Sequence, residues 1–257
     1  MKKANLFYIA IVFVYLYVPI AVLIINAFNA NRYGLQWDGF TLGWFQAMLN
    51  NHSLIEAARN SLLVAVSSAT IATTIGALGA VAMYFQRFKG RKVVFGTIIS
   101  LMMLPDIILA IALLVLFIIL GLSLGFWSLL LAHITFCLPF TFVTVFARMQ
   151  GFDPYLIEAA RDLGASEGMV LRTIVFPLIS PALIASWLLG FTLSLDDVIV
   201  SSFVAGPGFD VLPLRIFSMV KVGVKPEVNA LASLMILISI IFVATSYFLL
   251  KEKAHEN

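Results

Sequence analysis

The sequence predicts an all-α, polytopic membrane protein with six transmembrane helices in a single domain, residues 1–257. Of its residues 62% are hydrophobic and only 11% are charged, whereas a soluble domain has about 25% charged residues. The Lys and Arg residues also leave six apolar stretches, each longer than the roughly 20 residues that cross a bilayer as a helix. These properties exclude a disordered chain, a nucleic-acid-binding domain and an ordinary soluble enzyme.

The apolar stretches are continuous rather than alternating, and a helix satisfies its own backbone in lipid. The predicted spans are residues 5–28, 60–86, 93–120, 127–147, 179–203 and 228–250. The first follows Lys2 and Lys3, as a signal peptide would, but its apolar core is too long and lacks a nearby small-residue cleavage site. We therefore interpret the first stretch as a retained helix.

Basic residues predict the orientation of the spans, because cytoplasmic loops carry an excess of Lys and Arg. Six spans place both termini on one side, and that side holds 11 of the 16 basic residues, against five on the other. The densest group is Arg87, Lys89, Arg91 and Lys92. We therefore expect both termini in the cytoplasm.

Small residues predict how the second span packs. Ser68, Ala72, Gly76 and Ala80 recur every four residues and line one helix face. Such a stripe lets the backbone of another helix approach closely. The single cysteine, Cys137, excludes a disulfide within the chain and is expected to be a small core residue.

Three acids lie in the predicted spans, which contain no Lys or Arg: Asp106, Asp196 and Asp197. A charge near the centre of a membrane helix costs about 2.5–3.5 kcal/mol. These acids are therefore expected to face a water-filled path, to be paired, or to be protonated. Asp106 lies near the middle of the third span and follows Pro105, which removes a backbone donor and can kink the helix.

In a continuous fifth span, Ser194, Asp197 and Ser201 share one face, and Asp196 points about 100° away. One interpretation is that the acids form hydrogen bonds to neighbouring helices. The functional interpretation is a negative lining that attracts a cation. An anion path is disfavoured, because no span contains a basic residue to balance the charge, although helix N-termini can bind anions.

Two aromatic side chains need separate interpretations. Trp44, in the predicted outer loop of residues 29–59, can attract an ammonium group by about 0.5–2 kcal/mol or can anchor the chain at the membrane interface. His133, in the fourth span, is expected to be a packed, hydrogen-bonded residue rather than a ligand. No cluster of His, Cys and carboxylates has the spacing of a metal site.

A long loop of mixed charge, about residues 148–178, links the fourth and fifth spans. Asp153 is the predicted N-cap of a short helix with Pro154 at its first position, and Gly164 ends that helix. Ser166 is expected to cap a second helix that continues into the fifth span. The apolar face of the short helix, which the membrane, the bundle or another protein must cover, consists of Leu156, Ala159, Ala160 and Leu163.

This loop resembles the EAA loop of permease subunits of ATP-driven (ABC) importers. The family pattern is Glu-Ala-Ala, three residues, Gly, nine residues, then Ile-x-Leu-Pro. The only departure is Phe176 in the Leu position, which is a hydrophobic substitution. The matching residues are Glu158, Ala159, Ala160, Gly164, Ile174 and Pro177.

The resemblance extends over most of the chain. Residues 193–206, 212–218 and 223–230 are similar to stretches of spermidine/putrescine permeases, the C-type subunits in particular. Related importers of iron or thiamine share much of this pattern. The resemblance implies a type I ABC importer permease fold in the bacterial inner membrane.

The resemblance also implies partners. A second permease subunit would complete the path as a heterodimer, two copies of a cytoplasmic ATPase would bind below, and a periplasmic polyamine-binding protein would deliver the substrate. Membrane lipid would cover the remaining surface, and no nucleic acid is expected. The chain lacks a phosphate-binding Gly-x-x-x-x-Gly-Lys-Ser/Thr motif, so we expect no enzyme activity and no cofactor in it, with ATP and Mg bound by the ATPase.

The expected function is a path for polyamines, coupled to the ATPase through the long loop. Two alternatives stay open: another cationic substrate such as ferric iron or thiamine, and a proton-coupled secondary transporter. No catalytic or metal-binding residue is expected. The expected substrate-path residues are Asp106, Asp196, Asp197, Trp44 and Ser194, and the expected coupling residues are the six of the EAA match.

Overall fold

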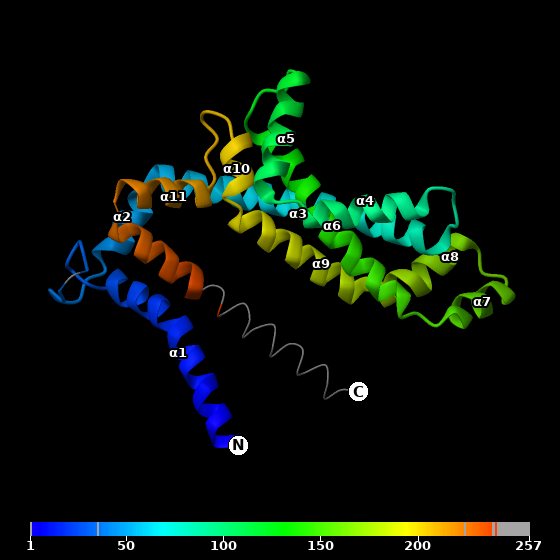
Figure 1. Ribbon diagram of the computed structural model, residues 1–257, viewed down its shortest axis with the longest axis horizontal. Coiled ribbons are helices and arrows are strands. Elements are labelled where there is room, and N and C mark those ends of the chain that lie inside the picture. The colour runs from blue at the N-terminus through cyan, green and yellow to red at the C-terminus, as the bar shows by residue number, and fades with distance from the viewer. Residues whose placement is uncertain (1, 35, 224, 238–239, 241–257) are drawn as a thin grey trace. The chain divides into compact units, whose positions relative to one another are not determined.

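Helices dominate the structure, a computed structural model that describes residues 2–34, 36–223, 225–237 and 240. In chain order they are α1 (Lys2–Ala27), α2 (Gly43–Asn50), α3 (His52–Phe85), α4 (Arg91–Met103), α5 (Asp106–Ile119), α6 (Phe126–Gln150), α7 (Pro154–Asp162), α8 (Glu167–Val170), the π-helical turn η1 (Leu171–Val175), α9 (Phe176–Asp196), α10 (Ile199–Val204) and α11 (Leu212–Val222) (Figure 1). Residues Pro226–Leu237 form a further short apolar helix. The described residues contain no strand, and their only β-type pairing is an isolated bridge between Asn29 and Phe40.

Four helical segments in the described part are long and apolar enough to cross a membrane. They are Tyr8–Ala27 within α1, α3, α6 and the continuous run Glu167–Asp196. The bent pair α4 and α5 raises the number to five if it forms one span. The predicted sixth span, residues 228–250, lies mostly outside the described residues, so the number six stays a prediction.

The predicted third span is wrong as a single helix. The axes of α4 and α5 differ by 111°. Leu104 is extended, at φ −69° and ψ 135°, because a residue before proline is pushed out of the helical region. Pro105 supplies no N–H group to continue α4. Asp106 consequently lies in the first turn of α5 rather than inside a continuous helix.

The predicted fifth span also has different ends. The helical run starts at Glu167, passes through η1 and stops at Asp196 rather than Phe203. Asp197 is extended, at φ −66° and ψ 125°, and α10 starts two residues later. Residues 197–198 therefore break the predicted fifth span.

The chain divides into two compact units, Glu56–Arg215 and a unit formed by Met1–Ile55 with Ile216–Asn257. In the Glu56–Arg215 unit, the small-residue face of α3 packs as predicted. Ser68, Ala72 and Ala80 are fully buried. At Gly76, an added Cβ would meet Thr141 Oγ1 of α6 and would lie 2.9 Å from the backbone N of Phe142. α3 and α6 therefore touch through their backbones.

This close approach gives a stability prediction. We expect Gly76→Ala to destabilise the protein by about 1–3 kcal/mol, because the added methyl has no space unless the two helices move apart. Gly96→Ala is the matched control, since Gly96 is also helical but has nothing within 4 Å of an added Cβ. Thermal unfolding of the detergent-purified importer measures both. Equal midpoints for the two variants would contradict the close helix contact.

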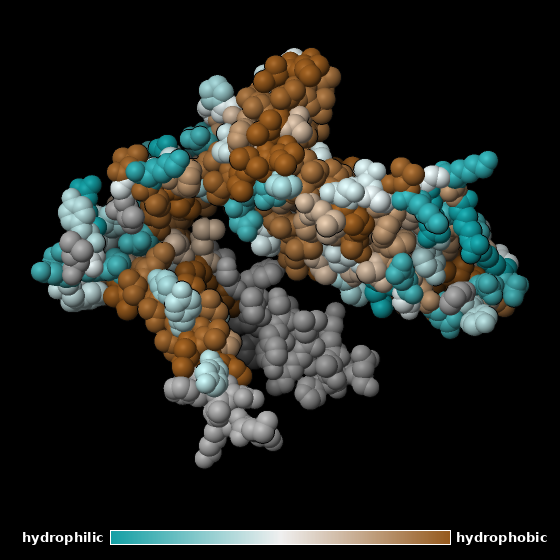
Figure 2. Space-filling model, in the orientation of Figure 1, coloured by the Kyte–Doolittle hydropathy of each residue, from teal (hydrophilic) through white to brown (hydrophobic). Residues whose placement is uncertain are grey.

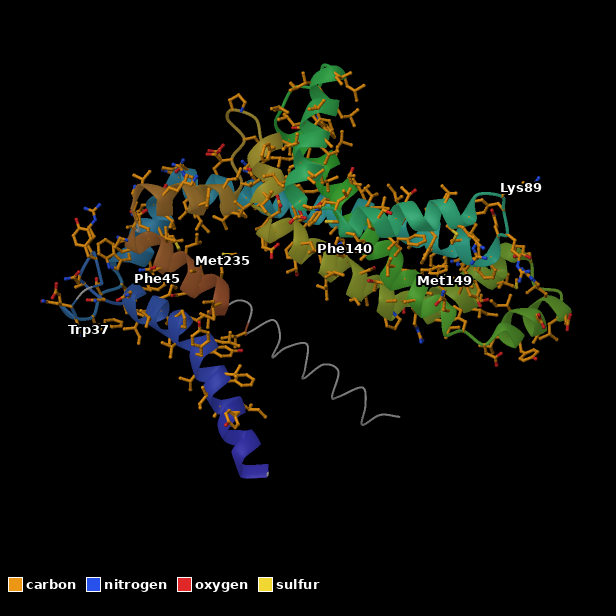
Figure 3. All side chains as sticks on the ribbon, in the orientation of Figure 1. Trp37, Phe45, Lys89, Phe140, Met149 and Met235 are labelled. Atoms are coloured by element: carbon orange, nitrogen blue, oxygen red, sulfur yellow. The ribbon has the colours of Figure 1, made fainter. Side chains whose placement is uncertain are left out.

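Hydrophilic residues gather at one end of the Glu56–Arg215 unit, over α7, α8 and the loop between α3 and α4, whereas α5 is covered by hydrophobic residues (Figure 2). Lys89 lies on that loop (Figure 3). One buried cluster joins Met83 at the end of α3, Met149 at the end of α6, Ile157 of α7 and Val170 of α8. The basic loop before α4 and the loop with α7 therefore lie at the same end of this unit, as the orientation argument requires.

Candidate functional site

A network of polar side chains surrounds the break between α9 and α10. The ring of His133, on α6, is 1% exposed. Its Nδ1 lies 2.7 Å from Ser194 Oγ, near the end of α9, and its Nε2 lies 3.1 Å from Ser201 Oγ, in α10. Ser68, on α3, lies 3.0 Å from Ser194 through the two hydroxyl oxygens. Four helices thus meet at one buried group of hydrogen bonds.

Asp197 takes part in this network and lies two residues before the start of α10. Its Oδ1 accepts a hydrogen bond from the N–H of Val200 at 3.1 Å, and its Oδ2 accepts one from the N–H of Ser201 at 2.7 Å. His133 Nε2 is 3.6 Å from Asp197 Oδ2. Asp197 stands one residue before the N-cap position of α10, which Val198 occupies, and its carboxylate satisfies two of the first N–H groups of that helix in competition with helix continuation from α9.

Two predictions about this region need correction. Asp197 does have a basic companion, His133, although no Lys or Arg lies in the spans. Ser194, Asp197 and Ser201 do come together, but the break and the ring of His133 bring them there rather than the face of one continuous helix. The expectation that His133 is packed and hydrogen-bonded is confirmed. These residue types also occur in hydrolase triads, but Ser194 is buried among the chain's own helices.

The other two acids have exposed side chains in this chain. Asp196 is the last residue of α9, and Asp106 is the first residue of α5. An acid is stabilised at a helix N-terminus and destabilised at a C-terminus, because of the helix dipole. Asp106 is therefore in a favourable position, whereas Asp196 adds a negative charge to the negative end of α9.

Trp44 belongs to the other unit, the one formed by the two ends of the chain. It lies in α2, and its Nε1–H donates a hydrogen bond to the carbonyl oxygen of Asn29 at 2.8 Å. The side chain is half-buried. The indole N–H is therefore occupied, while part of the ring surface stays available to a ligand or to lipid.

The loop helix α7 forms as predicted. Asp153 Oδ1 accepts a hydrogen bond from the N–H of Tyr155 at 3.0 Å, so Asp153 is the N-cap. Gly164 has φ +85°, the left-handed conformation with which helices often end. Ser166 Oγ accepts from the N–H of Met169 at 3.4 Å and caps α8. Arg161 and Glu167 form an ion pair at 2.9 Å between α7 and α8.

One side of α7 is packed and the other is open. Ile157, which is 6% exposed, joins the buried cluster of α3, α6 and η1, and Ala160 packs against it. Leu156 is 50% exposed and Leu163 is 89% exposed. The predicted apolar face is thus largely open, and the bundle itself does not cover it. Glu158 and Ala159 are also exposed.

Ile174 and Pro177 lie where the loop enters α9. Ile174 is in η1, and Pro177 is in the first turn of α9. Ser180 Oγ donates to the carbonyl oxygen of Pro177 at 2.9 Å, which Pro181 leaves without its usual N–H donor. The EAA residues therefore occupy one continuous segment from α7 to α9.

The role of His133 as a link between helices, and that of Ser68, was not predicted. The available signal was a histidine in an otherwise apolar span, which is costly unless both ring nitrogens have partners. Among the described residues, no three His, Cys, Asp or Glu side chains are grouped as metal ligands.

The chain is similar to known membrane transport proteins. Residues 72–253 match the family model described as "Binding-protein-dependent transport system inner membrane component". The chain is 55% identical to "Spermidine/putrescine transport system permease protein PotC" of Escherichia coli (strain K12), over 96% of this chain and 93% of the relative. It is 39% identical to "Putrescine transport system permease protein PotI" of the same strain, over 87% and 82%.

A solved structure has a similar fold. It is a chain of a bacterial ABC transporter involved in the import of the acidic polysaccharide alginate, with a TM-score of 0.73 and 18% identity, over 98% of this chain and 95% of that chain. The similarity at this identity concerns the fold.

Proposed function

The chain belongs to the family of binding-protein-dependent transport system inner membrane components, and we propose that it is a permease subunit of an ATP-driven importer of spermidine and putrescine. The observation that carries the proposal is 55% identity to a spermidine/putrescine permease over 96% of the chain. A function rests on the side chains of a site rather than on the fold alone. The alginate importer illustrates this, because a chain with a similar fold takes part in the import of an acidic polymer.

The proposed cargo fits the charges of the spans. Spermidine and putrescine are flexible polycations whose ammonium groups are separated by methylenes. Asp106 and Asp196 are exposed carboxylates at helix ends, and acids inside a membrane protein usually serve transport. We propose that these two acids receive ammonium groups and that Trp44 contacts the substrate at the entrance. Asp197 and Ser194 support the path from inside the bundle, because both side chains are buried.

The partners follow from the family. We propose that a second permease completes the path and that a periplasmic binding protein delivers the polyamine. Two ATPase subunits would bind on the cytoplasmic side and supply the ATP and Mg chemistry, with α7 of this chain in a groove of the ATPase. The end with α7 would face the cytoplasm, since its loops are rich in Lys and Arg. Lipid would cover much of α1, whose apolar side chains from Tyr8 to Val18 are exposed.

Reconstitution tests the function. The chain is placed in proteoliposomes with the proposed second permease, ATPase and binding protein, and uptake of radiolabelled spermidine and putrescine is measured. We expect uptake that needs ATP and the binding protein and persists when a protonophore removes the proton gradient. Preferential uptake of thiamine or ferric iron, or uptake driven by a proton gradient without ATP, would reject the proposal.

A further inference from the structure

We propose that His133 is a positioning residue for the cation path, an inference that depends on the transport function proposed above. The ring of His133 bonds to both sides of the break between α9 and α10, through Ser194 on one side and Ser201 on the other. Its burial excludes direct contact with a substrate in the path. Its effect on transport would therefore act through the residues that it holds.

The first of these residues is Asp197. In a continuous helix, the N–H groups of Val200 and Ser201 would bond to the carbonyl oxygens of Asp196 and Asp197, four residues earlier. Here both N–H groups bond to the Asp197 carboxylate instead. The carboxylate of Asp197 thus replaces two backbone carbonyl oxygens as the acceptor. His133 Nε2 lies 3.6 Å from its Oδ2. The ring and the carboxylate together keep α10 separate from α9.

The break changes the surroundings of Asp196. Because of the break, the N–H groups of Val200 and Ser201 no longer bond to the carbonyl oxygens of Asp196 and Asp197. These carbonyl oxygens lie at the C-terminal end of α9, which is the negative end of its dipole. The exposed carboxylate of Asp196 lies at the same helix end. A primary ammonium group carries three N–H donors and no acceptor. A carboxylate beside carbonyl oxygens that lack helical donors suits such a group.

The unfavourable position of the Asp196 carboxylate supports a role in binding a cation. Asp196 is at the helix end where an acid is destabilising, so it contributes nothing to the stability of α9 there. An ammonium ligand would neutralise that charge. The network is also connected to α3, because Ser194 is hydrogen-bonded to Ser68, which lies on the close-packed face of that helix. We infer that His133 fixes the helix end at which Asp196 binds the cation.

The test is a double-mutant cycle in the reconstituted importer, with spermidine uptake as the measurement. We expect His133→Leu to raise KM about tenfold, an amount that corresponds to one lost interaction with a charged group, while Vmax and the amount of assembled complex stay near wild type. His133→Gln, which keeps a donor near the position of Nε2, should give a smaller rise. In the Asp196→Asn background, His133→Leu should raise KM no further, because coupled residues are not additive.

Thr135→Ala is the matched control, since Thr135 is also on α6 and its hydroxyl bonds only to the Leu131 carbonyl of the same helix. If His133→Leu does not accumulate in the membrane, Ser201→Ala enters the same cycle, as it removes one partner of the ring and keeps the capping N–H. A change in Vmax alone, an unchanged KM, or additive effects with Asp196→Asn would overturn the positioning role. Absence of spermidine uptake by the wild-type importer would reject the transport function instead.

Discussion

Asp196→Asn is expected to lower kcat/KM for spermidine uptake by roughly 10- to 100-fold, because a hydrogen bond to a charged group contributes about 1.5–3 kcal/mol. The substitution removes the charge and keeps the shape of the side chain. Asp196 is exposed and ends α9, so the fold does not depend on its carboxylate. The amount of complex recovered with the ATPase should stay at the wild-type level. Uptake of labelled spermidine over a range of concentrations measures the effect.

Asp197→Asn is the matched comparison at the neighbouring position. Asn keeps one acceptor oxygen for the Val200 or the Ser201 amide, although its NH2 group replaces the other acceptor, and the side chain at position 197 is buried rather than open to the path. We therefore expect a smaller loss of uptake than for Asp196→Asn. A larger loss at position 197 than at 196, with equal amounts of complex, would show that the buried acid is the main cation ligand.

The sequence predicted the features that arise from local backbone chemistry. Pro105 cannot continue a helix, so a bend at this point was foreseeable, although its size of 111° was not. Asp153, Gly164 and Ser166 each act on residues within three positions, and each lies at a helix end as predicted. The sequence also predicted the close-packed face of α3, because small residues four positions apart lie on the same face of a helix.

The break at Asp197 was not predictable in the same way. Residues 198–204 are apolar apart from two serines and contain neither Pro nor Gly, so periodicity extended the fifth span to Phe203. The break depends on one carboxylate that takes two amide donors from the helix, and on a histidine 64 positions earlier in the chain that faces that carboxylate. Contacts between distant residues of this kind leave no local pattern. The position of Asp196 at the end of α9 depends on these long-range contacts, so the sequence did not predict it.

Gly164→Val should loosen the binding of the ATPase to α7 and so reduce transport. Gly164 has φ +85°, a conformation that costs an L-residue about 1–2 kcal/mol and suits β-branched residues least. Relief of this strain would turn α7 relative to α8 and would move the open face with Leu156 and Leu163. We expect uptake to fall at least tenfold, which corresponds to a loss of about 1.4 kcal/mol or more of docking energy. Less ATPase should be recovered with the tagged permease.

Gly90→Val provides the control for strain alone. Gly90 has φ +95° and open space around it, as Gly164 does, and it lies in the basic loop at the same end of the unit. Because Gly90 precedes α4 rather than linking α7 to α8, its substitution should cost similar stability and leave ATPase binding intact. If both variants lose ATPase to the same extent, strain rather than the geometry of α7 explains the loss. If Gly164→Val retains wild-type uptake and ATPase recovery, the segment Glu158–Gly164 does not couple the two proteins.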